Sequence, residues 1–354
     1  MLAVESFCRS MLGWYDTHGR KNLPWHMQRT PYRVWISEIM LQQTQVPTVT
    51  PFFLRFIDRF PDVQALAEAS LEQVMELWSG LGYYARARNL HQAARTLARQ
   101  HGGAIPPDRS ALLELPGIGR STAGAILSLG HGIPAAILDG NVKRVLCRYW
   151  RIHGWPGKPA VAKQLWSLSE QLTPTSRAGD YNQAMMDLGA IVCLVRRPNC
   201  SVCPLAQGCS AYRYGETDQL PAPKPKRSIP SRESHMLLLR DQRGKVYLEH
   251  RPPTGFWGGL WSFPMFAEEP ELFEWCAERS IEPLSLERLQ WRRHTFSHFH
   301  LDYLPILVQV NTPRNQVAEA GHERWCTPGV RPTFGLPAPV RRLLDDLGHR
   351  ATSE

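Results

Sequence analysis

Two carboxylates in the first half of the chain, Glu38 and Asp139, have sequence contexts that suit acid–base chemistry. Glu38 is the only charged residue in the run 34–41, which is apolar on almost every side and therefore predicts a buried helix. Burial disfavours the ionised form of a carboxyl group, so Glu38 could hold a proton at neutral pH and donate it. A glutamate bonded to the backbone, or paired with an arginine, fits the same pattern equally well.

Asp139 follows the apolar run 135–138 and precedes G-N-V-K-R at 140–144. An aspartate at such a place is more often the N-cap of a helix than a catalyst. Hydrolysis of a glycosidic bond, however, requires two carboxyl groups, one to protonate the leaving group and one to stabilise an oxocarbenium ion. The following segment is cationic, because positions 141–158 contain no acidic residue and include Lys143, Arg144, Arg148, Arg151 and Lys158.

Four cysteines with the spacing C-x6-C-x2-C-x5-C form a candidate metal centre: Cys193, Cys200, Cys203 and Cys209. A structural zinc and a four-iron cluster can both take four cysteine ligands. Zinc ribbons usually pair two C-x2-C hairpins, whereas one such pair occurs here, so the spacing favours the cluster. The loop also carries Arg196 and Arg197, which fit either phosphate contacts or a solvated charge pair. The other four cysteines are scattered and are typical of core packing.

A glycine-containing turn, L-P-G-I-G at 115–119, lies between two helical patterns. Gly117 and Gly119 allow positive φ angles and close approach of another backbone. They also leave backbone N–H groups at the start of the next helix, where these groups can bind a phosphate oxygen. Such a contact would position a nucleic acid without reading its sequence.

Two further segments carry side chains that could enter a base stack. Gln42 ends the helix of Glu38, and G-L-G-Y-Y-A-R-A-R at 80–88 combines glycines with Tyr83 and Arg86. An enzyme that reaches a base inside a duplex flips the base out and fills the gap with a side chain. The aromatic residues of this segment fit a helix core equally well.

The elements that would position these residues fall into two regions. Helical patterns span 3–18, 30–46, 62–78, 84–100, 120–129, 140–150 and 160–172, which predicts a mainly α region over 1–214. Residues 215–234 interleave four prolines with Lys224, Lys226 and Arg227 and predict a semi-extended, solvated linker. Over 235–350, strand patterns at 235–240, 245–250 and 299–310 and a helix pattern at 340–347 predict a smaller α+β domain.

Composition narrows the possible functions. With 354 residues, 43% of them hydrophobic, and 12 tryptophans, the chain fits two folded domains and excludes wholesale disorder. The net charge of +9 divides into +7 for residues 1–220, +3 for 221–230 and −1 for 231–354, so the first region suggests a polyanionic partner. No signal-peptide pattern or membrane-length apolar run occurs, which predicts a soluble cytoplasmic protein without a membrane partner.

Together these motifs resemble the helix-hairpin-helix DNA glycosylase superfamily, and within it the bacterial MutY-type adenine DNA glycosylases. The resemblance rests on S-E-I-M-L-Q-Q-T at 37–44, G-Y-Y-A-R-A-R at 82–88, the glycine turn, L-D-G-N-V-K-R at 138–144 and the four cysteines. It continues through G-F-W-G-G-L-W at 255–261 and H-T-F-S-H at 294–298. It implies a helix-hairpin-helix domain, with the hairpin at 109–130 and an iron–sulfur loop at 193–209, followed by a Nudix-like domain that recognises 8-oxoguanine.

The resemblance also implies an activity: hydrolysis of the N-glycosidic bond of adenine mispaired with 8-oxoguanine or guanine in double-stranded DNA, by a monomer at the bacterial nucleoid. Glu38 would protonate the base, Asp139 would stabilise the oxocarbenium ion and Asn141 would orient Asp139. Contacts to DNA would come from Gln42, Tyr83, Arg86, Gly117, Gly119, Ser121 and Lys143. Phe296, Ser297 and His298 would sense 8-oxoguanine, and Cys193, Cys200, Cys203 and Cys209 would hold one [4Fe-4S] cluster.

Two departures from related patterns refine this expectation. Bifunctional, endonuclease III-like relatives carry a lysine in an R-K-T-A run after the hairpin, whereas this chain has Ser121 in R-S-T-A. We therefore expect base excision without strong strand cleavage, with at most weak lyase activity from Lys143. The Nudix metal box R-E-x-x-E-E also has no counterpart after residues 261–264, which favours recognition over hydrolysis in the second domain. An endonuclease III-like lyase and a non-catalytic DNA-binding iron–sulfur protein are the alternatives.

Overall fold

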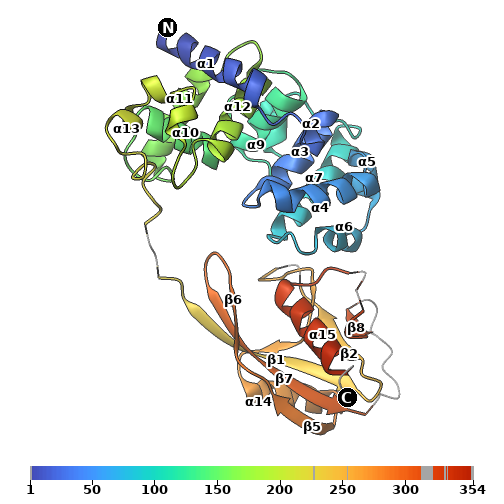
Figure 1. Ribbon diagram of the computed structural model, residues 1–354. Helices are drawn as coiled ribbons and strands as arrows, with labels where there is room; N and C mark the ends of the chain where they lie inside the picture. Colours follow the sequence, from blue (N-terminus) through green and yellow to red (C-terminus); the bar gives the residue numbers. More distant parts are fainter. Residues whose placement is uncertain are drawn as a thin grey trace. The chain divides into compact units, whose positions relative to one another are not determined.

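The computed structural model describes residues 2–225, 228–252, 254–311, 322–330, 332 and 334–351. The chain forms two compact units: Met1–Ala69 with Arg88–Lys226, and Ser70–Ala87 with Arg227–Glu354. Figure 1 shows the helices α1–α13 and the strands β1, β2 and β7 with α14 and α15. The second unit is thus built from two separate stretches of sequence. Two cations of the expected linker, Lys226 and Arg227, lie outside the described residues. The boundaries expected for the helical domain, the linker and the second domain stay predictions.

The first unit is helical, as expected. Its helices are α1 (Leu2–His18), α2 (Pro24–Met27), α3 (Pro31–Leu41), α4 (Val46–Arg59), α5 (Val63–Glu68), α7 (Ala85–Gln100), α8 (Arg109–Leu113), α9 (Arg120–Ala125), the π-helical turn η1 (Ile126–Gly130), α10 (Gly140–Tyr149), α11 (Pro159–Leu172), α12 (Ala178–Ile191) and α13 (Ser210–Arg213). The sequence patterns missed α4 and α12 entirely. The single helix expected over 62–78 is wrong, because it breaks after Glu68, and a separate helix α6 (Leu71–Trp78) begins in the second unit.

Helix α3 shows why this unit holds its central carboxylate in place. Thr30 caps the helix by accepting a 3.2 Å hydrogen bond from the N–H of Arg33, and proline occupies the first turn. Trp35, Ile36 and Met40 are fully buried, so the helix runs through the core. The helix ends at Leu41, five residues before the expected end, and Gln43 follows in the left-handed region at φ 59°.

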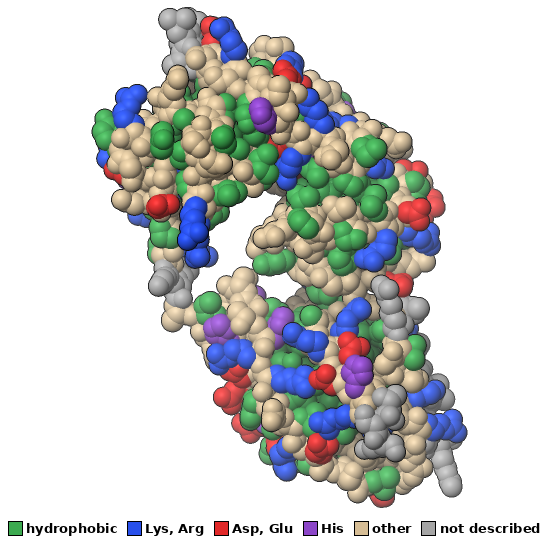
Figure 2. Space-filling model, in the orientation of Figure 1, with side chains coloured by type: hydrophobic (Ala, Val, Ile, Leu, Met, Phe, Trp, Pro, Cys, Tyr) green, Lys and Arg blue, Asp and Glu red, His purple; other side chains and the backbone are tan. Residues whose placement is uncertain are grey.

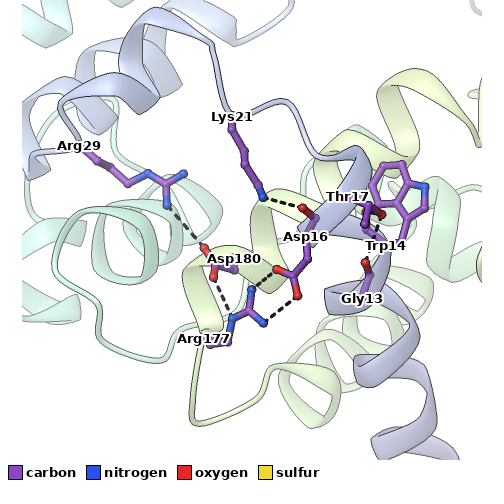
Figure 3. Close-up of polar contacts among 8 residues, drawn as sticks. All are labelled: Gly13, Trp14, Asp16, Thr17, Lys21, Arg29, Arg177 and Asp180. Carbon is purple, nitrogen blue, oxygen red and sulfur yellow. Dashed lines mark hydrogen bonds and ion pairs between the residues drawn. The ribbon is translucent and has the colours of Figure 1, made fainter.

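Ionic contacts fasten the end of α1 to the start of α12 (Figure 3). Arg177 donates to the carboxylate of Asp16 at 2.5 and 3.2 Å and to Asp180 at 3.0 Å, while Lys21 donates to the carbonyl of Asp16 at 2.7 Å. These pairs are exposed, so solvent screening leaves each of them little effect on stability. A more buried pair lies nearby, where Arg20 bonds the fully buried Asp187 of α12 at 2.8 Å. The contacts therefore fix Arg20 against α12.

The second unit is α+β. Its mixed sheet has the path β3-β2-β1-β7-β5, with β4 paired to β1, β6 to β7 and β8 to β2. The strands are β1 (Ser231–Asp241), β2 (Val246–His250), β3 (Trp261–Ser262), β4 (Met265–Phe266), β5 (Pro283–Arg288), β6 (Arg292–Thr295), β7 (His300–Val310) and β8 (Glu323–Cys326), with helices α14 (Glu269–Glu278) and α15 (Ala338–Ala351). The three expected strands and the closing helix are confirmed as β1, β2, β7 and α15, and the strand β1 begins inside the segment expected as linker.

The core of the sheet lies between β1, β7 and α14. Strands β1 and β7 run parallel in register from Ser231 opposite His300 to Asp241 opposite Val310. Leu237, Leu239 and Ile306 on these strands are fully buried and pack with Leu272 of α14. Figure 2 shows Lys and Arg side chains interspersed with Asp and Glu over the visible face of this unit, in keeping with its near-zero net charge. Among the described residues, no helix has the length and apolarity to span a membrane.

Candidate active site

A cavity of about 860 Å³ in the first unit brings together five residues expected to act on the substrate. Glu38 enters it from α3, Gln42 from the turn that follows α3, Ser121 from the first turn of α9, and Asp139 and Asn141 from the start of α10. The residues come from three separate stretches of the chain, so only the fold unites them. This cavity is the candidate active site.

Glu38 is the group best placed to donate a proton. Its side chain keeps partial exposure because it faces the cavity, while the surrounding protein raises the pKa of the carboxyl to about 8 by burial, with a smaller contribution from the charge of Asp139. Within the part of the chain that the structure describes, no arginine pairs with Glu38 and no backbone group bonds it. The alternatives of a backbone-bonded or arginine-paired glutamate are therefore not what the fold shows.

Asp139 caps helix α10 and faces the same cavity. One carboxylate oxygen accepts a 2.8 Å hydrogen bond from the N–H of Val142, and the other accepts a 3.1 Å bond from the amide of Asn141. Burial raises the pKa of Asp139, but both hydrogen bonds and the charge of Arg144 oppose that rise because they favour the carboxylate. Asp139 thus has hydrogen-bond donors that favour its carboxylate form, whereas Glu38 has none among the described residues. The N-cap and the catalytic interpretations of Asp139 are compatible.

A buried arginine connects Asp139 with the cysteine loop. Arg144 donates to the amide oxygen of Asn141 at 2.9 Å, to the carbonyl of Gly189 at 2.6 Å and to the carbonyl of Cys193 at 2.7 Å. Position 189 is a glycine, and a Cβ added there would lie only 2.5 Å from the Cβ of Asn141. Arg144 therefore serves to hold Asn141, and not as a free surface cation.

Three residues of the cavity escaped the sequence patterns. Arg20, Trp25 and Gln183 also line it. Gln183 is buried and donates a 2.9 Å hydrogen bond to Asp187, which in turn accepts from Arg20. The only sequence signal for them was a polar Gln and Asp, four residues apart, in an otherwise apolar stretch, and that stretch was not expected to be a helix.

The four cysteines line one small cavity of their own, together with Arg148. Within the described residues, no three His, Cys, Asp or Glu side chains lie close enough to share a single metal ion. Four cysteine thiols are a donor set that both a zinc ion and a four-iron cluster take. Arg148 is buried, donates to the thiol of Cys193 at 3.2 Å and bonds the carbonyl of Leu194 at 2.6 Å. Leu194 and Val195, next in the loop, line the active-site cavity.

The glycine turn joins α8 to α9 as expected for a helical hairpin. Gly117 adopts φ 82°, whereas Gly119 adopts an extended conformation as the N-cap of α9. Neither glycine lines the active-site cavity, nor does Lys143, which lies one turn along α10. Ser121 accepts a 3.0 Å hydrogen bond from the N–H of Leu138 and so ties the hairpin to the residue before Asp139.

Tyr83 and Arg86 belong to the second unit, in the segment Ser70–Ala87. Tyr83 is 48% exposed and adopts φ 50°. Arg86 is 9% exposed; its guanidinium lies over the rings of Trp78 and Tyr83 and donates to the carbonyl of Gly82 at 3.0 Å. Arg86 thus packs against Tyr83 and supports its ring. The expected contact of Arg86 with DNA stays a prediction.

Phe296, Ser297 and His298 follow strand β6 in an aromatic cluster. The ring of Phe296 stacks on that of Phe299 at 4.5 Å and meets His294 edge-on at 4.6 Å. Ser297 and His298 are exposed. The Ser297 hydroxyl lies 3.4 Å from Nδ1 of His298, and the His298 ring meets that of Phe299 edge-on at 4.9 Å.

Comparison with known proteins agrees with this geometry. Residues 36–171 match the model for the HhH-GPD superfamily of base excision DNA repair proteins, and residues 235–346 match the NUDIX domain. An adenine DNA glycosylase from Buchnera aphidicola (subspecies Schizaphis graminum) is 39% identical over 345 residues, covering 97% of this chain and 99% of the relative. The human adenine DNA glycosylase is 36% identical over 407 residues, covering 96% of this chain and 74% of the relative.

The chain belongs to the adenine DNA glycosylase family. Its helical HhH-GPD unit also resembles a solved thermostable thymine-DNA glycosylase, with 31% identity and a TM-score of 0.55 over 60% of this chain and 97% of the other. A non-covalent endonuclease III–DNA complex, at 22% identity and a TM-score of 0.52, shares the fold over the same 60% of this chain and 97% of the other.

Two acidic residues of α14 make contacts within the Nudix domain of this adenine DNA glycosylase family member. Glu271 accepts hydrogen bonds from the N–H groups of Ala267 and Glu268 and so closes the capping box of α14. Glu269 pairs with Arg288 of β5. Two carboxylates of the segment where a hydrolase would bind metal are therefore engaged in caps and ion pairs.

Proposed function

We propose that the chain excises adenine mispaired with 8-oxoguanine or guanine from duplex DNA by hydrolysis, as a monomer acting in the cytoplasm. The observation that carries the proposal is the pairing of Glu38 and Asp139 in one cavity, where burial raises the pKa of Glu38 to about 8 and hydrogen bonds to Asp139 favour its carboxylate form. Two carboxyl groups with separated pKa values are what acid-assisted glycosidic cleavage needs.

The reaction starts with proton transfer from the Glu38 carboxyl to a ring nitrogen of the flipped adenine. The bond between the sugar C1′ and the base then breaks, its electron pair leaves on the base, and the protonated base departs as neutral adenine. Asp139, oriented by Asn141, stabilises the positive charge on the sugar. Water adds to C1′ and loses a proton, which leaves an abasic site.

The adenine would be held by groups beside the two carboxylates. The guanidinium of Arg20 and the amide of Gln183 line the cavity and can offer hydrogen bonds to the base edge, and Trp25 offers a ring. Gln42 and Tyr83 would enter the base stack of the DNA when the adenine flips out. Ser297 and His298 would recognise 8-oxoguanine. The backbone at Gly117 and Gly119, together with Ser121 and Lys143, would contact phosphates.

Cys193, Cys200, Cys203 and Cys209 would hold one [4Fe-4S] cluster. The cluster would supply a redox-capable inorganic centre that ties the loop together when bound. The residues of the chain do the rest, because Arg148 and Arg144 bond the loop at Cys193 and its neighbours and so join it to α10.

The test is release of free adenine from an A:8-oxoguanine duplex under single-turnover conditions. We expect release by the wild-type protein, and none by Glu38→Gln, which keeps the shape of the side chain but has no proton of suitable acidity to give. Binding of the uncleaved duplex should be largely retained in that variant. Absence of adenine with the iron-loaded wild-type protein would refute the proposal.

A further inference from the structure

The loop that carries Tyr83 is anchored to a single backbone position elsewhere in the second unit, Leu336. The hydroxyl of Tyr84 donates to the carbonyl of Leu336 at 3.1 Å and accepts from the N–H of Gly80 at 3.3 Å. The hydroxyl of Ser79 exchanges hydrogen bonds with the carbonyl and the N–H of Leu336 at 3.3 and 3.4 Å. Leu336 itself is buried, with 1% of its surface exposed.

Other contacts brace the same anchor. Arg341 of α15 donates to the hydroxyl of Ser79 at 2.9 Å. Arg324 bonds Glu72 at 3.3 Å, and its guanidinium lies over the rings of Trp261 and Phe334. A Cβ at Gly335 would lie 3.2 Å from the carbonyl oxygen of Met75, so the backbone of α6 comes close to residue 335. The segment Ser70–Ala87 is therefore held at several points, and not only by its chain ends.

The loop around Tyr83 has a backbone conformation that must be stabilised by contacts with other residues. Tyr83 takes a left-handed φ of 50°, which is strained for a non-glycine residue, and its ring is half exposed. Gly80 and Gly82, at φ 103° and 77°, give the loop freedom to adopt other shapes. A side chain on such a loop points in one direction only if bonds on both sides of it fix the backbone.

We propose that Ser79, Tyr84 and Arg341, acting through Leu336, are positioning residues that set the pose in which Tyr83 meets the DNA stack. The inference rests on the proposed function, because it takes Tyr83 as the residue that enters the duplex. Ser79 anchors the backbone on the N-terminal side of Tyr83 through its hydrogen bonds to Leu336. Tyr84 anchors it on the C-terminal side, because its hydroxyl bonds both Leu336 and Gly80. Loss of either hydroxyl leaves the fold in place but releases the direction of the Tyr83 ring.

The experiment is a double-mutant cycle between Tyr84→Phe and Tyr83→Ala, measured by single-turnover adenine release from an A:8-oxoguanine duplex. One hydrogen bond lost at this anchor should slow release about 3- to 10-fold in the wild-type background. In the Tyr83→Ala background the same change should cost less than about 2-fold, because there is no ring left to position. Ser79→Ala should follow Tyr84→Phe, and Ser79→Thr, which keeps the hydroxyl, should behave as wild type.

The matched control is Tyr32→Phe, which also removes a tyrosine hydroxyl that donates to a backbone carbonyl, that of Phe60 at 2.8 Å. It should lower Tm as Tyr84→Phe does, but it should change the rate of adenine release by the same factor in both Tyr83 backgrounds. Equal losses for Tyr84→Phe with and without the Tyr83 ring, or no loss at all, would overturn the inference while adenine release by the wild type still upholds the proposed function. If the wild type releases no adenine, the proposed function is what has failed.

Discussion

The amide of Asn141 donates a 3.1 Å hydrogen bond to Asp139 while its oxygen accepts a 2.9 Å bond from Arg144. The amide is thus fixed on both sides, and the carboxylate it serves also caps the helix that carries all three residues. One turn of α10 therefore determines where the negative charge of the active site lies.

Asn141→Ala should slow adenine release about 10-fold or more, because it removes a hydrogen bond to an ionised group. The bond from Val142 remains, so the helix cap and the fold should persist. Single-turnover rates together with duplex affinity check this: affinity should change little. A variant with wild-type rates would show that Asp139 needs no orientation by Asn141.

The pH profile of release should reflect Glu38. Because burial raises the pKa of Glu38 to about 8, the carboxyl is protonated below that value and loses its proton above it. The rate should therefore fall as the pH rises through about 8. A rate that instead rises across this range would mean that Glu38 is not the proton donor.

The same shift has a consequence for stability. The folded protein holds a proton on Glu38 that the unfolded chain releases near the ordinary pKa of 4.5, so the contribution of this group makes the fold less stable as the pH rises from 4.5 to about 8. Glu38→Gln removes that contribution and should raise Tm at pH 8 relative to wild type, with a smaller difference at pH 5. Thermal melts at the two pH values measure it.

The cysteine loop should bind iron and not zinc. We expect iron and acid-labile sulfide in a ratio of about one to one, and about four of each per chain. Cys203→Ser should lose most of the iron, whereas Cys276→Ser, a buried cysteine of the Nudix core, should keep it. Stoichiometric zinc in the purified protein, with no iron, would contradict the cluster.

Position 121 should control lyase chemistry. Ser121 lines the active-site cavity with Asp139, so a lysine there would bring an amine to the abasic aldehyde. We expect little borohydride trapping by the wild type and clear trapping by Ser121→Lys. Any residual trapping in the wild type should fall in Lys143→Ala; strong trapping that survives this change would favour the bifunctional alternative.

The two glycines of the hairpin should differ in their tolerance of alanine. At Gly117 the φ angle is 82° and an added Cβ would lie 3.0 Å from the Cβ of Asn89, whereas at Gly119 the backbone is extended with no atom within 4 Å of an added Cβ. Gly117→Ala should destabilise the fold by about 1–2 kcal/mol, and Gly119→Ala should be close to neutral. Urea titrations of both variants compare them directly.

The sequence was sufficient to predict α3, α10 and the strands β1, β2 and β7 because local signals agree there: Thr30 and Pro31 start α3, and Asp139 starts α10. It was not sufficient for α12, whose apolar residues face several neighbours and show no clear stripe. Gln183 of α12, and Arg20, which bonds Asp187 of the same helix, were therefore not predicted as site residues. The apparent cationic cluster of Arg144 and Arg148 could not be recognised as buried, because its partners are carbonyls far along the chain.

The two-part make-up of the second unit affects the order in which the chain can fold during synthesis. The stretch Ser70–Ala87 leaves the ribosome long before the residues from Arg227 onward that complete its unit. The bonds of Ser79 and Tyr84 to Leu336, and the close approach of Met75 to Gly335, can form only after that second stretch has been made. A nascent chain that ends within the linker therefore holds the loop of Tyr83 without the hydrogen bonds that anchor it in the finished protein.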